Sequence, residues 1–501
     1  MANERERKGK KKFWRKYHRY VGLIFSLFLI MFCISGVILN HRTAVSSIDV
    51  SRNLLPSSYK IQNYNNGIIK ATLRYKKDSI LCYGVGGCWV GDKNFQFFRT
   101  LNGGFDEGID NKKVNGVIIS KDSTYYSITQ YNFYKLINDS WHKIPLRDNK
   151  ERLSDLTLKG DSIIILSRSK VFIFSSKDNK VTSLQLTPPT NYKNKTTLFK
   201  LVWLLHSGAL FGTVGKVVVD LIAIIITLLC VGGIIHFFLP YSIKRKTKKN
   251  IECGGEKAFM RNNLKLHRKV GLWTIVLTIF ITLTGMSLRP PLMVPLVLNK
   301  INAIKSVATD SKNPFFDKLR AIRWDEGTNS WLISTSEGWY RARTLDSRLQ
   351  KIDFSPYISP MGVNIFEKDS KDNWIIGSFA GIVRWNTKTN EIKDYFTNKD
   401  YVFTRNKRPV GNVMASGYSA DIEGKGDVIF TYDKGSLTPI PEMSKTLQKT
   451  PISLWNLALE VHTGRIYSFF LGQLNSMYVF LSGVIVILIL VSGIIIIHKR
   501  K

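Results

Sequence analysis

Four long apolar stretches constrain this sequence more than any other feature. They lie at residues 21–39, 217–239, 270–288 and 477–497. A helix needs about 20 mainly apolar residues to cross the hydrocarbon core of a bilayer, and a segment in lipid must satisfy its backbone hydrogen bonds internally. Each stretch is therefore predicted to be a membrane-spanning helix. The first also has the basic front of a secretory signal, but no clear small-x-small cleavage site follows it, so we interpret it as an uncleaved anchor.

The net charge of +36, from 73 Lys and Arg against 37 Asp and Glu, is concentrated around these stretches. In a soluble protein such a charge would indicate a nucleic-acid partner. Here the densest basic runs, within residues 1–20, 244–249 and 498–501, each flank an apolar stretch, which is typical of cytoplasmic loops. We therefore expect the lipid bilayer, and not nucleic acid, as a partner. The predicted location is a bacterial inner membrane, with both termini cytoplasmic and the large domains periplasmic.

This topology divides the chain at the ends of the predicted helices. The cytoplasmic parts are the N-terminus (1–20), one loop (240–269) and the tail (498–501). Periplasmic domain 1 (40–197) and periplasmic domain 2 (289–453) are followed by interfacial segments, at 198–216 and 454–476 respectively, that lead into the next helix.

The two halves of the chain resemble each other. Lys-x-His-Arg-x-Val-Gly occurs at 16–22 and, 249 residues later, at 265–271; the same shift places Ser35 on Thr284. A second match pairs "LLHSGALFG" at 204–212 with "EVHTGRIYS" at 460–468. Both halves cross the membrane in the same sequence of directions, so they are expected to be parallel repeats related by an axis along the membrane normal. Equivalent residues would then lie at equal depth.

Histidine placement is the most informative consequence of this repeat. Of eight histidines, four map to the inner membrane edge and three to the outer edge. The edges are about 34 Å apart along a helix with a rise of 1.5 Å per residue, so they define two layers. Ionisable side chains in or near a membrane are rare and costly, which favours a functional role. The inner layer contains His18, His236, His267 and His498, and the outer layer contains His41, His206 and His462.

Two imidazoles that face each other in an apolar helix bundle are typical of bis-histidine haem ligation. We predict two haem b groups, an outer one held by His206 and His462 and an inner one held by His18 and His267. His236, His498 and His41 are rival ligands, although histidines at helix ends beside Lys or Arg, such as His41 and His498, also suit a purely interfacial role. No metal other than haem iron is expected, and C-x-x-C-H, the haem c attachment motif, does not occur.

The opening "WRKYHRYVGL", the later "SGVILNHR", the "LHSGALFG" segment and their recurrence resemble the PepSY-associated transmembrane family, which includes iron-regulated membrane proteins and ferric-siderophore reductases. The resemblance implies delivery of electrons across the inner membrane to periplasmic ferric iron or a ferric chelate, with haem carrying the electron and His18, His206, His267 and His462 as signature positions. The activity expected from it is that of a ferric-chelate reductase. The inner loop is too short for a flavin or nicotinamide domain, so the electron donor would be quinol or a separate reductase.

The external segments are predicted to be mainly β. Runs at 161–176, 329–344 and 372–396 are rich in β-branched and aromatic residues and are divided by Gly, Asn, Asp and Ser turns. The last run resembles a hairpin of a propeller blade, but no constant repeat period is evident. The predicted fold is an α-helical membrane protein: a four-helix bundle from two parallel repeats, with two mainly β extracytoplasmic domains. These domains are propeller-like or, alternatively, PepSY-like α+β, and could pack as one unit.

Three further predictions concern the remaining polar groups. Cys82 and Cys88 are joined by "YGVGG", whose glycines favour a tight turn, and are predicted to form a disulfide in an oxidising compartment. Asp220 has no acidic counterpart in the second half and is interpreted as a solvated carboxylate at a helix start. Nucleotide-binding and hydrolase motifs are absent from the sequence. The alternative to electron transfer is a non-enzymatic accessory or sensor protein whose β domains bind a partner.

Overall fold

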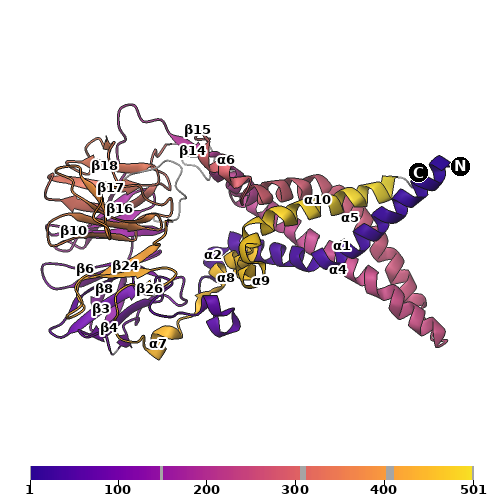
Figure 1. Cartoon of the computed structure of the whole chain (residues 1–501), viewed down its shortest axis with the longest axis horizontal. Coiled ribbons are helices and arrows are strands. Elements are labelled where there is room, and N and C mark those ends of the chain that lie inside the picture. Colours follow the sequence, from indigo (N-terminus) through magenta and orange to yellow (C-terminus); the bar gives the residue numbers. More distant parts are fainter. Residues whose placement is uncertain (1, 97, 147–150, 305–311, 402–410, 499–501) are drawn as a thin grey trace. The chain divides into compact units, whose positions relative to one another are not determined.

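The computed structural model describes residues 2–96, 98–146, 151–304, 312–401 and 411–498, with side chains from residue 12 to residue 497. The chain forms two compact units, which are described separately (Figure 1). The helical unit contains Met1–Val45, Asn194–Ser311 and Trp455–Lys501. The β unit contains Ser46–Lys193 and Lys312–Leu454.

Long apolar helices build the helical unit. Among the described residues, four helical regions are long and apolar enough to cross a membrane: Lys12–Asn40, Ala209–Lys248, Gly254–Ser287 and Arg465–Ile497. They contain α1 (Ala2–Asn40), α4 (Gly212–Lys248), α5 (Gly254–Ser287) and α10 (Tyr478–His498). Helix α1 packs against α4 and α10, and α5 packs against the same two helices.

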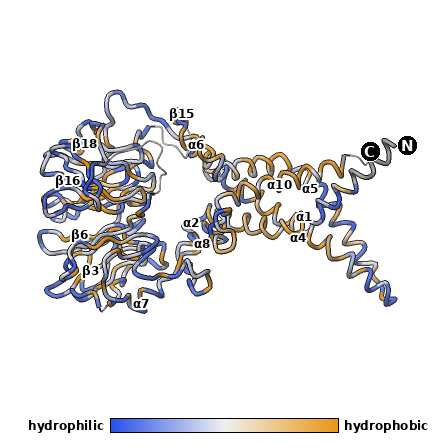
Figure 2. The backbone as a smooth tube through the Cα atoms, in the orientation of Figure 1, coloured by the Kyte–Doolittle hydropathy of each residue, from blue (hydrophilic) through white to orange (hydrophobic). Residues whose placement is uncertain are grey.

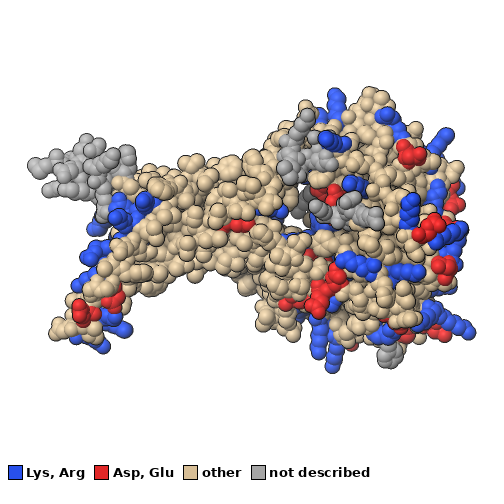
Figure 3. Space-filling view, turned by 180° about the vertical axis from the view of Figure 1, so that it is seen from behind, with Lys and Arg blue, Asp and Glu red and all other residues tan. Residues whose placement is uncertain are grey.

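These helices are largely hydrophobic along the bundle, as Figure 2 shows. Leu27 on α1 and Val276 on α5 are 62% and 73% exposed, respectively. A helix that is apolar on every face is suited to lipid contact. On the side seen in Figure 3 the bundle carries few charged side chains along its length, and Lys and Arg gather towards one end. This unit therefore has the character of a multi-pass membrane protein.

A short helix that ends in histidine precedes the second long helix of each half. Helix α3 (Leu198–His206) is followed by Gly208 and the 3₁₀ turn η3 (Ala209–Phe211). Helix α8 (Leu454–His462) is followed by Gly464 and η4 (Arg465–Tyr467). Both glycines have left-handed backbone conformations, with φ of 71° and 76°, which glycine adopts without steric cost. The other small elements of this unit are α2 (Arg42–Val45), α6 (Met293–Leu298), α9 (Ser468–Leu471), η5 (Gly472–Met477) and the strand pair β14 (Lys195–Thr197) and β15 (Lys300–Asn302).

The β unit consists of antiparallel blades in chain order. Their strands are joined by tight turns, such as Asn138-Asp139 between β8 and β9, where both residues have positive φ. Blade 1 contains β2 (Ala71–Tyr75), β3 (Ser79–Gly84), β4 (Gly87–Asp92) and β5 (Phe98–Thr100); blade 2 contains β6 (Val114–Ile119), β7 (Tyr125–Thr129), β8 (Phe133–Ile137) and β9 (Ser140–Ile144); blade 3 contains β10 (Leu153–Lys159), β11 (Ser162–Ser167), β12 (Val171–Ser175) and β13 (Lys180–Leu184).

The second β segment supplies the remaining blades. Blade 4 contains β16 (Leu319–Asp325), β17 (Ser330–Thr335), β18 (Gly338–Ala342) and β19 (Gln350–Ile352); blade 5 contains β20 (Ile365–Lys368), β21 (Trp374–Ser378), β22 (Gly381–Trp385) and β23 (Ile392–Asp394); blade 6 contains β24 (Ala415–Ser419), β25 (Val428–Thr431) and β26 (Gly435–Ser436). Outside the blades lie η1 (Arg52–Leu54), η2 (Ser57–Tyr59), α7 (Lys445–Gln448) and the pair of β1 (Asp49–Val50) with β27 (Ile452–Ser453).

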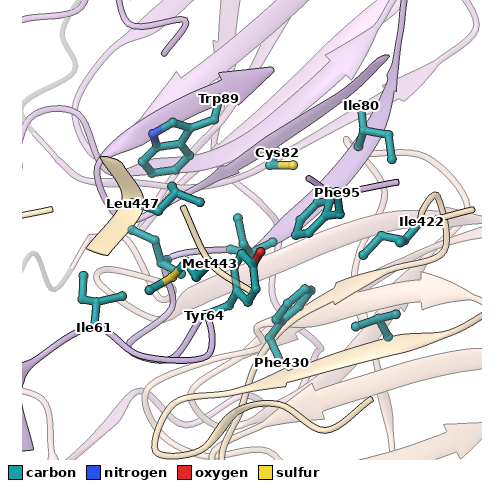
Figure 4. Packing of buried hydrophobic residues seen from close by; sticks show 13 residues of the cluster. Ile61, Tyr64, Ile80, Cys82, Trp89, Phe95, Ile422, Phe430, Met443 and Leu447 are labelled. Carbon is teal, nitrogen blue, oxygen red and sulfur yellow. The ribbon is translucent and has the colours of Figure 1, made fainter. Parts of the chain in front are cut away.

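Hydrophobic packing closes these blades into a ring. In the described part of the chain each blade shares a buried cluster with the next, and blade 6 shares one with blade 1, where β2 and β24 also pair in parallel (Figure 4). A closed ring covers the faces of every blade and leaves only short, protected sheet edges, which is the advantage of propellers. The clusters include, in ring order, Tyr75 with Val117, Phe133 with Phe174, Ile164 with Ile333, Trp339 with Trp374, Ile375 with Ile429, and Phe430 with Trp89.

The β segments predicted as two domains thus form one six-bladed propeller among the described residues, in which the two segments contribute three blades each. The α+β alternative is wrong, because the only helices of the described part of this unit are short turns. The sequence left this closure open, because each segment alone would leave apolar faces of its terminal blades uncovered and only the other segment covers them.

Two side-chain arrangements in the propeller matter for later arguments. Cys82 packs in the cluster between blades 6 and 1, whereas Cys88 packs in the cluster between blades 1 and 2. The two thiols therefore lie on opposite faces of the β3–β4 hairpin, both are free, and the predicted disulfide is not formed. Asp325 is almost completely buried and accepts hydrogen bonds from Thr328, Thr387 and the indole of Trp374, which ties blade 4 to blade 5.

Candidate functional site

The imidazole rings of His206 and His462 lie close together in the helical unit. Their ring centroids are 6.1 Å apart, at an interplanar angle of 52°. Each histidine is the last residue of its short helix, and the left-handed glycine two residues later turns the chain into the following long helix. The structure therefore places the two histidines that the sequence predicted as a pair next to each other. The glycines that follow them serve this turn, because a Cβ atom on Gly208 would lie 2.2 Å from the carbonyl oxygen of Gly215.

Backbone carbonyls fix the orientation of both rings. Nδ1 of His206 lies 3.2 Å from the carbonyl oxygen of Ile281 and 3.1 Å from Oγ1 of Thr284. Nδ1 of His462 lies 3.1 Å from the carbonyl oxygen of Phe32 and 3.0 Å from Oγ of Ser35. A carbonyl oxygen only accepts, so the proton is on Nδ1 and the lone pair is on Nε2. Nε2 is the nitrogen that remains available to a metal.

These contacts cross between the halves of the chain. His206 belongs to the first half and binds α5 of the second, whereas His462 belongs to the second half and binds α1 of the first. A glycine follows each hydroxyl residue and gives the ring space. A Cβ atom on Gly285 would lie 2.8 Å from Cε1 of His206, and one on Gly36 would lie 3.3 Å from Cε1 of His462. Sequence reasoning matched these positions across the repeat but did not connect them to the histidines.

His18 and His267 form a second pair with nearly the same spacing. Their ring centroids are 6.4 Å apart and the rings are nearly perpendicular, at 86°. Nδ1 of His18 lies 3.1 Å from the carbonyl oxygen of Ile489 and 2.9 Å from Oγ of Ser492. A Cβ atom on Gly493 would lie 3.4 Å from Cε1 of His18. The same combination of carbonyl, hydroxyl and glycine thus surrounds three of the four paired histidines.

His267 departs from this arrangement. Gly233 stands beside its Cε1, at 3.7 Å from a built Cβ atom, as the repeat requires. However, Gly232 occupies the position equivalent to Ser492, so no hydroxyl is present there. In the described part of the chain the Nδ1 atom of His267 is buried and has no hydrogen bond of normal geometry. The His18–His267 pair is therefore asymmetric.

The rival ligands fit less well. Nε2 of His41 lies 2.7 Å from Oδ2 of Asp220, and Asn40 donates to the other carboxylate oxygen at 3.1 Å. His41 is thus engaged with a carboxylate, and Asp220, with 13% of its side chain exposed, is not the solvated group that the sequence suggested. Nδ1 of His236 is buried without a hydrogen bond among the described residues. His498 ends α10, but its side chain lies outside the described residues.

The distance between the two imidazole rings of each pair can be compared with the distance that haem ligation requires. Metal–imidazole bonds of about 2.0–2.1 Å, with a ring centre roughly 1.2 Å beyond each nitrogen, would separate two ring centroids by roughly 6.4 Å. The observed 6.1 and 6.4 Å agree with this separation. Among the described residues the Nε2 atoms of these four histidines form no hydrogen bonds, and hydrogen-bonded Nδ1 atoms with free Nε2 atoms are typical of metal-binding histidines. The donor set therefore fits a bis-histidine haem in each pair.

A family model described as the PepSY-associated TM region matches residues 2–239 and 177–500. The chain belongs to this family. Together the two matches extend over almost the whole sequence, and they overlap at residues 177–239. This agrees with the resemblance seen in the histidine motifs and supports a multi-pass membrane protein.

No curated protein matches the sequence. The solved structures that are similar include the extracellular domain described for a hybrid two-component system, BT4673 from B. thetaiotaomicron, with 10% identity, a TM-score of 0.34, and coverage of 77% of this chain and 40% of that chain. The N-terminal domain of Nup159 has 10% identity, a TM-score of 0.33, and coverage of 79% and 95%. The chain spans about two fifths of the length of BT4673, and similarity at these TM-scores carries no argument.

Proposed function

We propose that this protein is a haem-binding electron-transfer protein of the bacterial inner membrane, which passes electrons to periplasmic ferric iron or a ferric chelate. The observation that carries the proposal is the presence of two facing histidine pairs with free Nε2 atoms at different levels of one apolar bundle. Ser35, which binds His462, lies 17 residues after His18 in α1, or about 25 Å along the helix. The pairs are thus separated by most of the thickness of a bilayer core.

The chain itself supplies binding and orientation. In three of the paired histidines the bond from Nδ1 to a backbone carbonyl selects one tautomer and holds the ring, so that Nε2 points away from its own supporting helix. Haem b held by each pair would supply a one-electron carrier. The surrounding helices exclude water, and ligand identity and burial are the properties by which a protein sets the potential of such a group.

The direction of electron flow follows from the proposed topology. With the termini in the cytoplasm, the His18–His267 pair would lie on the side of the electron donor, either quinol or a separate reductase. The His206–His462 pair would lie on the periplasmic side, near the acceptor. The family resemblance to ferric-siderophore reductases favours a ferric chelate as that acceptor.

An optical spectrum of the detergent-purified protein, oxidised and then reduced with dithionite, tests the proposal. We expect sharp reduced b-type bands, and loss of about half the haem in both His206→Ala and His18→Ala. His142→Ala is the matched control, because His142 is an exposed residue of β9 in the propeller. A colourless protein from cells supplied with haem, or histidine variants with normal haem content, would contradict the proposal and favour the accessory or sensor role of the propeller.

A further inference from the structure

Arg289 carries a guanidinium just beyond the end of α5, the helix that holds His206. It lies four residues after Gly285, the residue against which His206 packs. Its Nε atom is buried without a hydrogen-bond partner, and among the described residues the side chain forms no ion pair. Removing a charged group from water without a partner is costly. Among the described residues the chain supplies no counter-ion for Arg289, whose side chain is only partly exposed.

The carboxylate that acts on Arg289 electrostatically, that of Glu460, is already engaged. Arg465 donates two hydrogen bonds to the carboxylate of Glu460: Nε donates to Oε2 at 3.0 Å, and Nη2 donates to Oε1. Burial lowers the pKa of Arg289 from its ordinary value, the positive charge of Arg465 acts in the same direction, and Glu460 acts in the opposite one. Arg465 therefore holds the Glu460 carboxylate, and Arg289 is influenced by it only electrostatically.

The repeat shows which group Arg289 lacks. The shift of 249 residues places Asn40 on Arg289, and Asn40 donates a hydrogen bond of 3.1 Å to the carboxylate of Asp220. Asp220 has no acidic counterpart in the second half, where Phe480 stands. The first half therefore supplies both the donor and the carboxylate, whereas the second half supplies a stronger donor but has no carboxylate at the position equivalent to Asp220.

We propose that Arg289 binds a carboxylate group of a ligand beside the His206–His462 pair, in the place that the carboxylate of Asp220 occupies in the first half. A planar guanidinium can hold a carboxylate through two parallel hydrogen bonds. The carboxylate has two chemical sources, the haem itself or an anionic ferric chelate. The identification of either source depends on the proposed function, whereas the binding of a carboxylate at Arg289 does not depend on it.

The test compares wild type with Arg289→Gln, Arg289→Lys and the control Arg261→Gln, an exposed residue near the other end of α5. Haem content per chain is measured, and then the rate at which reduced protein is reoxidised by ferric citrate or by the uncharged oxidant oxygen. If haem supplies the carboxylate, Arg289→Gln loses about half of its haem. If the chelate supplies it, haem content stays normal, reoxidation by ferric citrate slows about tenfold, and reoxidation by oxygen does not change.

Normal haem content together with normal reoxidation by ferric citrate in Arg289→Gln would overturn the inference. Arg289→Lys keeps the charge but loses the planar fork, so it should fall between wild type and Arg289→Gln, and it serves if the glutamine variant does not fold. If wild type is colourless, the proposed function fails, and citrate alone becomes the probe. Citrate should then raise the midpoint temperature of thermal unfolding of wild type and of Arg261→Gln, but not that of Arg289→Gln. The same change in all three proteins would overturn the inference.

Discussion

Replacement of the four glycines beside the paired histidines by alanine should have graded effects. In each case the new Cβ atom approaches Cε1 of a histidine, at 2.8 Å for Gly285, 3.3 Å for Gly36, 3.4 Å for Gly493 and 3.7 Å for Gly233. Contacts below about 3.0 Å force a displacement, whereas 3.7 Å is an ordinary van der Waals contact. We therefore expect disruption in the order Gly285, Gly36, Gly493, Gly233.

The magnitude follows from two opposing terms. Alanine in place of a helical glycine stabilises by about 0.5–1 kcal/mol where space is open. Overpacking costs about 1–3 kcal/mol, and moving His206 also breaks its Nδ1 bond to the Ile281 carbonyl, which costs about 1 kcal/mol more. Gly285→Ala should thus destabilise by about 1–3 kcal/mol and release haem. Gly233→Ala should be neutral or stabilising by up to about 1 kcal/mol.

Haem retention during thermal unfolding, followed by the reduced b-type bands, measures both effects. Gly22→Ala and Gly271→Ala are the matched controls, since they lie in α1 and α5 and a Cβ atom there has nothing within 4 Å. The reasoning is refuted if Gly285→Ala retains haem as well as Gly271→Ala does, or if Gly233→Ala is the most damaging of the four.

Three further results are expected. Thr284→Val removes the hydroxyl that contacts Nδ1 of His206, and Ser35→Ala removes the one that contacts Nδ1 of His462. Each variant should therefore bind haem more weakly by about 1 kcal/mol, as measured by transfer of haem to an acceptor protein. Unchanged transfer would show that the backbone carbonyls alone hold the rings. Burial acts to raise the pKa of Asp325, but its hydrogen bonds outweigh this effect and the pKa is lowered. The stabilisation that the Asp325 carboxylate gives the propeller is therefore complete above about pH 4 and is lost as the pH falls below that value. Tryptophan fluorescence should show that Asp325→Asn unfolds in acid at a higher pH than wild type, and an identical acid transition would contradict this. Burial raises the pKa of both Cys82 and Cys88 well above its ordinary value, so iodoacetamide should label them only after unfolding, and labelling of the folded protein would refute their burial.

The helical unit was largely predictable because its signals are local. Apolar length defined the helices, and the repeated Lys-x-His-Arg-x-Val-Gly motif identified His18 and His267 as equivalent residues. The pairing of His206 with His462 also followed from equivalence. The identity of the groups that hold them did not, because Ser35 and Thr284 become hydrogen-bond partners only where helices of different halves cross.

The propeller was less predictable because its closure depends on distant residues. The strands and turns of blades 4 and 5 were evident from aromatic and β-branched runs. Cys82 and Cys88 looked like a disulfide because sequence proximity suggested it, but adjacent positions on paired strands point to opposite faces. Pairing of β2 with β24 joins residues more than 300 positions apart, and no local pattern contains that information.

The crossed contacts explain why the two halves need each other. Each histidine pair takes one ring from each half, and His206, His462 and His18 are each held by a helix of the opposite half. The propeller likewise joins blades from both segments at two interfaces, between blades 3 and 4 and between blades 6 and 1. Exchange of partners between halves therefore stabilises both units. The symmetry is broken where Gly232 stands at the position equivalent to Ser492 and Arg289 at the position equivalent to Asn40.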